Sequence, residues 1–511
     1  MATVYDLFYN ALAPQTSNEF PIPSGGTLVV VQVNASTDFE IELQAYNLAS
    51  DSWFPVPVTD ESAVLGTRIR YGGIYKCDVG QHYRIRARLI SSDNVVSAKI
   101  FISDAKDGPV NASVKFPDRH LDAFGNLRIA SPVTLFDSQN TSGSQPVLWE
   151  NSTTAGGAVT YSNARASVSL SVSTGATDVA IRQTRQYFQY QSGKSQKILF
   201  TAVVGSAVLN VTKRLGYFDA NNGLLFEQDS NGLYVVRRTC VSGLAVDTRV
   251  AQADWNIDPL NGTGISGISL DASKAQIFII DFEWLGTGSV RFGVVVDGHI
   301  YYCHKMRHAN VLSVVYMSTP NLPVRFEIRN TASSAGGTLE QICTSVMSEA
   351  GFEEERGFLF GVSNGSSGTS VGSGTRTSIV AIRPATNIYG LSNRITILPS
   401  DISVVSNQTT LVELVYNPTL SGNPVWQKTD GNSGVEYTIT GSTFTGGIVA
   451  FAAFVAGAPG ALGAQTIDRS VISRLPIFRD INGANPIALS LAVTPSQNAT
   501  VEGAINWREL Y

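Results

Sequence analysis

Three histidines and a cysteine fall within ten residues of one another, at His299, Cys303, His304 and His308. Imidazole and thiolate are ligands that zinc prefers, and zinc holds all its ligands within about 2.3 Å of one point. The segment reads as a β-strand, so Cys303 and His304 leave opposite faces, and His299 lies about 13 Å from Cys303 at roughly 3.3 Å per residue. We therefore expect no metal site, with Cys303 in the core and the histidines at strand ends.

Two carboxylates, Asp281 and Glu283, lie two residues apart on one face of a predicted strand. Glycosidases use a pair of carboxyl groups, which lie about 5–5.5 Å apart in retaining enzymes and about 6.5–9.5 Å apart in inverting enzymes. The predicted hairpin, however, places Glu283 opposite Arg291, which favours a cross-strand ion pair. No nucleophile-elbow, P-loop or dinucleotide-binding motif occurs in a suitable context. We predict no catalytic residue, no enzymatic activity and no cofactor, and this pair remains the candidate for a depolymerase alternative.

Aromatic side chains at the surface can stack on sugar rings, because their faces are broad and weakly negative. The candidates are Trp53, Tyr187, Phe188, Tyr190 and Trp426. Packing in the core is the alternative for each ring, and we favour it unless the rings gather in one surface cluster.

The meander at residues 276–306 must position the histidines and the carboxylates. Its three strand patterns are separated by Gly286-Thr287-Gly288 and by Asp297-Gly298. Asp-Gly between apolar runs predicts a type I′ hairpin, which pairs Val296 with His299, Val294 with Tyr301 and Phe292 with Cys303. A three-residue loop at the first turn pairs Trp284 with Val290, Phe282 with Phe292 and Ile280 with Val294. Both registers gather the large apolar residues on one sheet face, which predicts a packed antiparallel meander.

The composition favours many short strands. The chain has 511 residues, of which 43% are hydrophobic and 15% are charged, against roughly 25% charged in an average soluble domain. The formal net charge is −5 and no run rich in lysine or arginine occurs, so we expect no nucleic-acid partner.

Cysteine spacing and hydropathy exclude further classes of protein. The four cysteines include no C-x-x-C pair, which excludes a zinc ribbon or a redox motif. The first residues lack a basic region followed by an apolar core, so we expect no signal peptide. The most apolar segment, 448–464, is interrupted by glycine and proline, so we expect no membrane insertion.

Residues 1–108 read as a small N-terminal β-sandwich, with strand patterns at 27–33, 39–46, 83–89 and 95–102. Within the third pattern, Arg84, Arg86 and Arg88 share one face. This row could bind an anion, but a solvated strand face is the simpler interpretation. Residues 116–139 fit neither a helical nor a strand period and are too apolar for a loose linker. We therefore predict an extended linker or arm over residues 109–145.

Residues 146–511 read as one large β-sandwich of the jelly-roll or lectin-like type, since no repeat indicates a solenoid or propeller. One short helix is predicted at 338–349, because Leu339, Ile342, Cys343 and Val346 recur at helical spacing. The predicted fold class is therefore all-β, with antiparallel sandwiches and this single helix.

Part of the arm resembles a segment of the virion structural proteins of tailed bacteriophages. Residues 122–139, DAFGNLRIASPVTLFDSQ, resemble the DAFG-x-LR…TLFDS segment of that group. Three later segments also resemble this group of proteins: GYFDANNGLLFEQDSNGLYVVRRT (216–239), QADWNIDPLNGTG (252–264) and STPNLPVRFEIRNT (318–331). The resemblance covers roughly residues 116–350 and carries no catalytic residues with it.

The resemblance implies a non-enzymatic structural component of a virion, assembled in the host cytoplasm and displayed as a fibre, capsid decoration or tail-appendage subunit. Its partners would be other capsid or tail proteins and copies of itself, with a homotrimer expected. Residues 1–108 depart from the shared part and would form an attachment or tip domain. The alternative is a receptor-binding tail fibre protein that recognises a host-surface glycan.

The arm is the part of the chain that we expect to make an assembly contact. We predict that residues 120–139 cross to another subunit or dock the N-terminal unit. The residues expected to carry this contact are Asp122, Phe124, Gly125, Leu127, Arg128, Leu135 and Phe136.

Overall fold

The computed structural model describes residues 2–11, 14–21, 28–34, 39–48, 50–59, 65–66, 68–70, 73–78, 84–92, 96–103, 132–349, 357–457, 463–467 and 477–511. The chain divides into two compact units, Met1–Lys115 and Phe116–Tyr511. Regular structure in the described ranges is β-strand, apart from the 3-10 turns η2 (Asn140–Ser142) and η3 (Gln252–Asp254). No helix in these ranges is long and apolar enough to cross a membrane. The predicted all-β fold class is confirmed.

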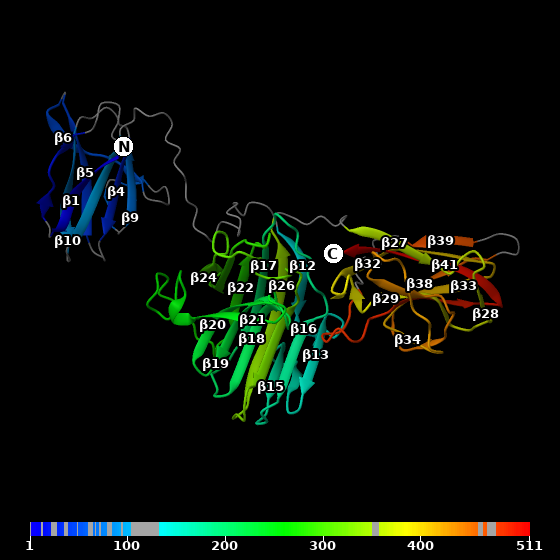
Figure 1. The fold of residues 1–511 in the computed structure, drawn as a ribbon. Helices are drawn as coiled ribbons and strands as arrows, with labels where there is room; N and C mark the ends of the chain where they lie inside the picture. The colour runs from blue at the N-terminus through cyan, green and yellow to red at the C-terminus, as the bar shows by residue number, and fades with distance from the viewer. Residues whose placement is uncertain are drawn as a thin grey trace. The chain divides into compact units, whose positions relative to one another are not determined.

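The first unit, blue in Figure 1, is a sandwich of two antiparallel sheets. Its strands are β1 (Ala2–Ala11), β2 (Gln15–Thr16), β3 (Phe20–Pro21), β4 (Leu28–Asn34), β5 (Phe39–Asn47), β6 (Ser52–Pro55), β7 (Val58–Thr59), β8 (Leu65–Gly66), β9 (Gly73–Asp78), β10 (Arg84–Ser92) and β11 (Val96–Ser103). One sheet has the order β1-β11-β4-β9-β7-β8 and the other β2-β10-β5-β6, with β3 beside β10. Alternate residues such as Val31 and Leu43 meet in one core. The boundary predicted at residue 108 lies outside the described residues.

The second unit begins with a sandwich that we call the middle sandwich, coloured cyan to yellow-green in Figure 1. Its strands are β12 (Val133–Gln139), β13 (Trp149–Thr154), β14 (Ala158–Ser162), β15 (Ser167–Val172), β16 (Val179–Thr184), β17 (Gln196–Val203), β18 (Val211–Phe218), β19 (Gly223–Asp229), β20 (Gly232–Thr239), β21 (Val246–Ala251), β22 (Gln276–Phe282), β23 (Val290–Val296), β24 (His299–Met306), β25 (Val324–Asn330) and β26 (Gly337–Ser348). One sheet has the order β14-β15-β26-β17-β22-β23-β24 with β12 beside β26, and the other β13-β16-β25-β18-β19-β20-β21. Their inner faces meet where Phe200 packs on Phe226 at 6.3 Å between ring centroids.

A second sandwich in the same unit, which we call the last sandwich, is coloured yellow to red in Figure 1. Its strands are β27 (Phe358–Ser363), β28 (Thr369–Val371), β29 (Thr377–Pro384), β30 (Asn387–Ile388), β31 (Leu391–Ser392), β32 (Thr396–Ser406), β33 (Thr410–Tyr416), β34 (Thr419–Leu420), β35 (Gln427–Lys428), β36 (Val435–Thr438), β37 (Phe444–Thr445), β38 (Ile448–Val455), β39 (Gly463–Ile467), β40 (Leu489–Pro495) and β41 (Ala499–Leu510). The sheets have the orders β27-β41-β32-β39, with β28 beside β41, and β35-β36-β29-β40-β33-β38.

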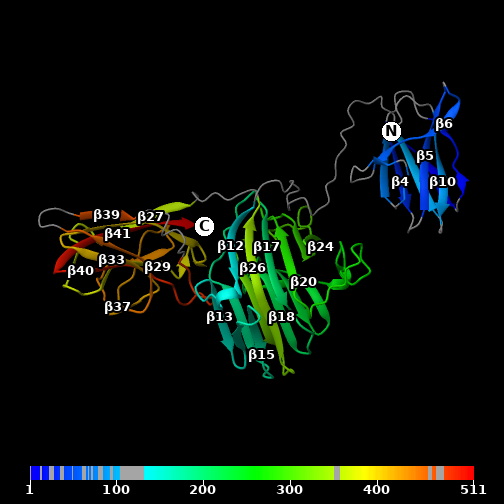
Figure 2. The ribbon, with the colours of Figure 1, turned by 180° about the vertical axis from the view of Figure 1, so that it is seen from behind.

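The single large sandwich expected over 146–511 is therefore two, and both views show separate sets of sheets (Figures 1 and 2). The middle sandwich has a core around Phe200 and Phe278, and the last sandwich has a separate core around Trp507 and Leu491. The physical reason is size, because a single hydrophobic core stops growing at roughly 250–300 residues.

The meander forms β22, β23 and β24, and its second turn is confirmed. Asp297 and Gly298 have φ values of 50° and 79°, and Val296 pairs with His299 and Val294 with Tyr301. A bulge then places His304, rather than Cys303, opposite Phe292. At the first turn the observed pairs are Phe282 with Val290, Ile280 with Phe292 and Phe278 with Val294. This register differs from the predicted one by two residues, which preserves the predicted apolar face.

The helix predicted at 338–349 is wrong, since residues 338–348 belong to β26. A register shift where β26 pairs with β17 leaves an extra residue between the partners of Phe200 and Ala202. Side chains on either side of such a bulge change face, so Leu339 and Val346 both enter the core. Their separation of seven residues equals two helical turns, which is why the strand imitated helical spacing.

The described end of the predicted arm is a strand of the chain's own middle sandwich. β12 pairs with β26, Phe136 is buried in the core and Leu135 packs against it. β12, β26 and β17 lie side by side in both views (Figures 1 and 2). The other predicted contact residues, Asp122, Phe124, Gly125, Leu127 and Arg128, lie outside the described residues.

Candidate binding site

The carboxylates Asp281 and Glu283 have separate partners in the structure. Arg291 lies opposite Asp281 in the β22–β23 ladder and donates a hydrogen bond to it. The Tyr302 hydroxyl and the Ser195 hydroxyl also donate to Asp281, each at 2.8 Å. Glu283 follows β22 and accepts a hydrogen bond from the Ser289 backbone N–H at 2.9 Å. The predicted ion pair to Arg291 thus forms with Asp281, because the register differs by two residues.

The histidines and cysteine of the meander lie in different surroundings. His299 is exposed, whereas Cys303 is fully buried and donates to the Phe292 carbonyl. His304 accepts a hydrogen bond from the Asn256 backbone N–H at 3.2 Å. His308 stacks on Tyr316 at 4.2 Å between centroids, and burial lowers its pKa. No group of three or more His, Cys, Asp or Glu in the described ranges is placed to hold a metal ion.

The aromatic residues proposed from sequence do not form a surface cluster. Tyr187, Phe188 and Tyr190 are buried. Trp53 and Trp426 are each half-buried and covered by a guanidinium, from Arg86 at 4.2 Å and Arg383 at 4.0 Å. These five rings therefore do not supply a sugar-stacking surface.

The row of arginines on β10 is partly engaged within the first unit. Arg84 pairs with Glu19 at 3.0 Å, and Arg86 donates to Gln44 at 3.0 Å beneath its contact with Trp53. Arg88 is exposed. Two of the three guanidiniums thus have partners within the chain, and the row does not form a shared anion site.

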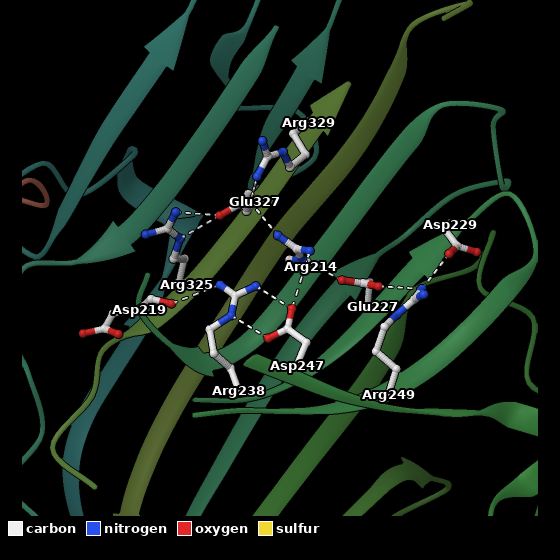
Figure 3. A network of polar contacts seen from close by, with 10 residues as sticks. All are labelled: Arg214, Asp219, Glu227, Asp229, Arg238, Asp247, Arg249, Arg325, Glu327 and Arg329. Atoms are coloured by element: carbon white, nitrogen blue, oxygen red, sulfur yellow. Dashed lines mark hydrogen bonds and ion pairs between the residues drawn. The ribbon is translucent and has the colours of Figure 1, made fainter. Parts of the chain in front are cut away.

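The outer face of the β13–β21 sheet carries a network of arginines and carboxylates, drawn in Figure 3. Arg214 lies at its centre and contacts Glu227 at 2.6 Å, Glu327 at 3.3 Å and Asp247 at 3.9 Å. Arg238 holds Asp247 with two hydrogen bonds of 2.8 and 2.9 Å. The remaining pairs are Arg249 with Glu227 and Asp229, Arg325 with Glu327, and Arg329 with Glu327.

The charges in this network are matched within the chain. Burial opposes ionisation of Glu327, but Arg325 and Arg214 outweigh it and lower its pKa. Burial likewise opposes ionisation of Asp247, and the hydrogen bonds from Arg238 lower its pKa. Each guanidinium drawn has a carboxylate partner, so the network is suited to holding five strands together rather than to catching an anionic ligand.

An apolar hollow of about 630 Å³ opens on the last sandwich. We call it the aromatic hollow, and it is lined by Phe358, Leu359, Phe360, Tyr389, Asp430, Asn432 and Tyr511. Phe358, Leu359 and Tyr389 are 68%, 63% and 67% exposed. Soluble proteins seldom expose several large apolar side chains side by side unless the patch binds something. The volume falls within the roughly 300–1,000 Å³ of small-ligand sites.

Tyr389 occupies a strained backbone position at the edge of the hollow. It forms, with Gly390, the two-residue loop of a hairpin in which Ile388 pairs with Leu391. The φ values of Tyr389 and Gly390 are 51° and 79°. Such a turn favours Asn-Gly, and a bulky residue with positive φ is uncommon. Strained backbone conformations are concentrated at functional sites, where a particular side chain is needed despite the steric cost to the backbone.

The polar side of the hollow is the turn that contains Asp430 and Asn432, and Glu509 accepts a backbone hydrogen bond from the end of this turn. This carboxylate is buried and accepts hydrogen bonds from the Gly434 backbone N–H at 2.8 Å and the Trp507 indole N–H at 2.8 Å. Asp430 accepts the Asn432 backbone N–H at 2.8 Å. These bonds hold the Asp430 and Asn432 side chains at one edge of the ring cluster.

The rings are oriented by contacts with one another and with this turn. Phe358 meets Tyr511 edge to face at 5.8 Å between centroids. The Tyr511 hydroxyl donates to the Asn432 carbonyl, and the Tyr389 hydroxyl donates to Asn432 Oδ1 at 3.2 Å. The Asn432 amide N–H groups have no acceptor within the described part of the chain. The hollow therefore offers ring faces, an amide donor and a carboxylate acceptor, and Asp430 is the single carboxylate among its lining residues.

Sequence reasoning missed this site, because its residues come from β27, a hairpin loop, a second turn and Tyr511. The single local signal is Tyr389-Gly390 inside a short turn pattern, which resembles many ordinary turns.

No known protein family matches the sequence, and no curated protein sequence matches it either. Similar solved structures include the SPBc2 prophage-derived protein YomS, which is 17% identical over 20% of this chain and 92% of that chain, with a TM-score of 0.19. A legume lectin-like domain from Entamoeba histolytica is 9% identical over 42% of this chain and 98% of that chain, with a TM-score of 0.26. A Bacillus licheniformis β-glucanase is 10% identical over 44% of this chain and all of that chain, with a TM-score of 0.27. At these scores the similarities identify neither a relative nor a function.

Proposed function

We propose that this chain is a non-enzymatic structural component of a bacteriophage virion, displayed on the particle exterior as a fibre, decoration or tail-appendage subunit. It acts through assembly with copies of itself and with other virion proteins. The segments that resemble those of virion structural proteins support this class of protein. The described residues form three β-sandwiches with separate cores, which are compatible with a modular building block.

The observation that carries the assembly role is the edge strand β38. It ends the sheet β35-β36-β29-β40-β33-β38 and, among the described residues, pairs with β33 alone. Its sequence, IVAFAAFV, contains no charged residue. Ile448, Val449 and Phe454 are 54%, 45% and 71% exposed. Edge strands of soluble proteins carry charge or proline to prevent pairing between chains, so an uncharged, exposed edge is suited to contact with another subunit.

A second copy of the same chain is the occupant that we propose for this edge. The strand is neutral and apolar, so it offers no charge pattern for an oppositely charged partner. Soluble oligomers are mostly assemblies of identical chains, and the homotrimer proposed from the resemblance would use this edge as one side of its interface.

Purified particles test the proposal directly. Mass spectrometry of gradient-purified particles should detect this chain in fixed stoichiometry, and gold-labelled antibodies against it should decorate intact particles. Complete, infectious particles that lack the chain would contradict the proposal. Labelling confined to disrupted particles would contradict the exterior position.

A further inference from the structure

We propose that the aromatic hollow binds the apolar face of an uncharged sugar within an oligosaccharide. This site is separate from the assembly role, and it uses none of the aromatic residues singled out from the sequence. It rests on the ring faces at Phe358, Tyr389 and Tyr511 and on the polar edge at Asp430 and Asn432.

The shape of the ligand follows from the lining. A pyranose ring has an apolar face of C–H groups and a periphery of hydroxyls that both donate and accept hydrogen bonds. Aromatic faces are weakly negative and attract such C–H groups while gaining dispersion energy. Asn432 accepts a hydrogen bond from the Tyr389 hydroxyl at 3.2 Å, and Asp430 lines the same hollow. Their amide and carboxylate groups can therefore supply partners for sugar hydroxyls.

The charge of the site selects among sugars. Asp430 is the charged residue among those that line the hollow, and Glu509 lies buried behind the turn. A uronic or sialic acid would bring a carboxylate towards Asp430, which is unfavourable at low salt. The hydroxyl groups of an uncharged sugar would instead donate hydrogen bonds to the Asp430 carboxylate.

The strained Tyr389 backbone gives the sharpest argument. Asparagine or glycine would fit the turn with less steric cost, so hairpin stability does not explain the tyrosine. Its ring is exposed and its hydroxyl holds Asn432. A ligand that stacks on this ring explains both the residue and its position.

Isothermal titration of the full chain with hexasaccharides of glucose, galactose, mannose, N-acetylglucosamine and sialic acid tests the proposal. We expect at least one of the four uncharged hexasaccharides to bind, and Phe358→Ala and Tyr389→Asn each to weaken it roughly tenfold. Tyr389→Phe should weaken it less, since the ring remains. Tyr9→Ala, at an aromatic residue that is 79% exposed in the first unit, should leave binding unchanged.

Three results would overturn the proposal. These are no binding of any uncharged hexasaccharide, tightest binding of the sialic acid oligomer, or unchanged binding in both Phe358→Ala and Tyr389→Asn. A change in oligomeric mass caused by Phe358→Ala, without a change in sugar binding, would instead make the hollow a contact between subunits. Each of these failures leaves the assembly role through β38 intact, because that role is read from particle mass and composition.

Discussion

Arg291 lies directly across the β22–β23 ladder from Asp281 and donates a hydrogen bond to it, with both side chains at most 2% exposed. Removing one partner of a buried ion pair leaves an uncompensated charge and costs about 3–5 kcal/mol. Asp281→Ala should therefore lower the free energy of unfolding by that amount. Urea denaturation of the full chain, with hydrogen exchange of the β22–β24 amides, measures it.

Two variants separate the charge effect from a general loss of packing. Glu283→Gln should cost less than about 1 kcal/mol, because the amide oxygen can still accept from the Ser289 N–H. The double variant Asp281→Leu with Arg291→Met should be less destabilised than Asp281→Ala, since neither charge remains buried. Equal losses in all three variants would show that the ion pair is not the cause.

Lys213 gives a pH dependence of stability. Its ammonium is buried and donates to the Val204 carbonyl at 2.6 Å and the Ser206 carbonyl at 2.8 Å. Burial lowers the pKa of Lys213 to about 8, against 10.5 for an ordinary lysine. Between these values the unfolded chain binds more protons, so the free energy of unfolding rises with pH from about 8 to about 10.5, by at most about 3 kcal/mol.

Lys213→Met provides the comparison for this pH dependence. The difference in urea midpoint between wild type and Lys213→Met should change over pH 8–10.5 and stay constant below pH 7. A difference that is independent of pH across this range would show that folding does not lower the pKa of Lys213.

The network around Arg214 should lose stability in acid. Because the pKa values of Glu327 and Asp247 are lowered in the folded chain, their contribution is present above the ordinary carboxyl pKa and is lost as the pH falls through the folded value. Glu327→Gln should destabilise the middle sandwich by about 3–5 kcal/mol at pH 7 and flatten this acid dependence. Thermal unfolding of wild type and Glu327→Gln at pH 7, 5 and 3 measures this dependence. A variant whose stability falls with pH as steeply as that of the wild type would contradict the prediction.

The turn at Tyr389 should tolerate a change that most tyrosines would not. Tyr389→Asn relieves the steric cost of a bulky residue in the left-handed region, so thermal stability should be unchanged or rise, by up to about 1 kcal/mol. Tyr389→Val keeps an apolar side chain but adds branching at the same φ, and should lower stability. A loss of stability in Tyr389→Asn as large as that in Tyr389→Val would mean that the ring itself holds the hairpin.

Alternation along strands made the fold class and the meander predictable from sequence. The first turn was misplaced by two residues, yet Phe278, Ile280 and Phe282 still fell on the core side because side chains repeat with period two. The same register decided the ion pair, which moved from Glu283 to Asp281. A polar contact between two strands requires the correct register. A buried face is preserved by any register shift of an even number of residues.

The positions of β-bulges, and contacts between residues far apart in the sequence, could not be predicted from the sequence. The bulge in β26 gave Leu339 and Val346 a helical spacing, and nothing local distinguishes that from a helix. The aromatic hollow brings Phe358, Tyr389 and Tyr511 together from distant segments. Their proximity is a property of the folded sheets, so each ring in isolation resembles any other exposed aromatic residue.

We propose that β38 is an interface between copies of this chain. Light scattering coupled to size-exclusion chromatography should give the wild type a mass of three chains, and Phe454→Lys should give one chain, because a charge at this exposed edge opposes pairing. Ile265→Lys, at a residue that is 90% exposed in the middle sandwich, should keep the wild-type mass. A wild type that is monomeric at all concentrations, or a Phe454→Lys variant with the full wild-type mass, would show that β38 is not this interface.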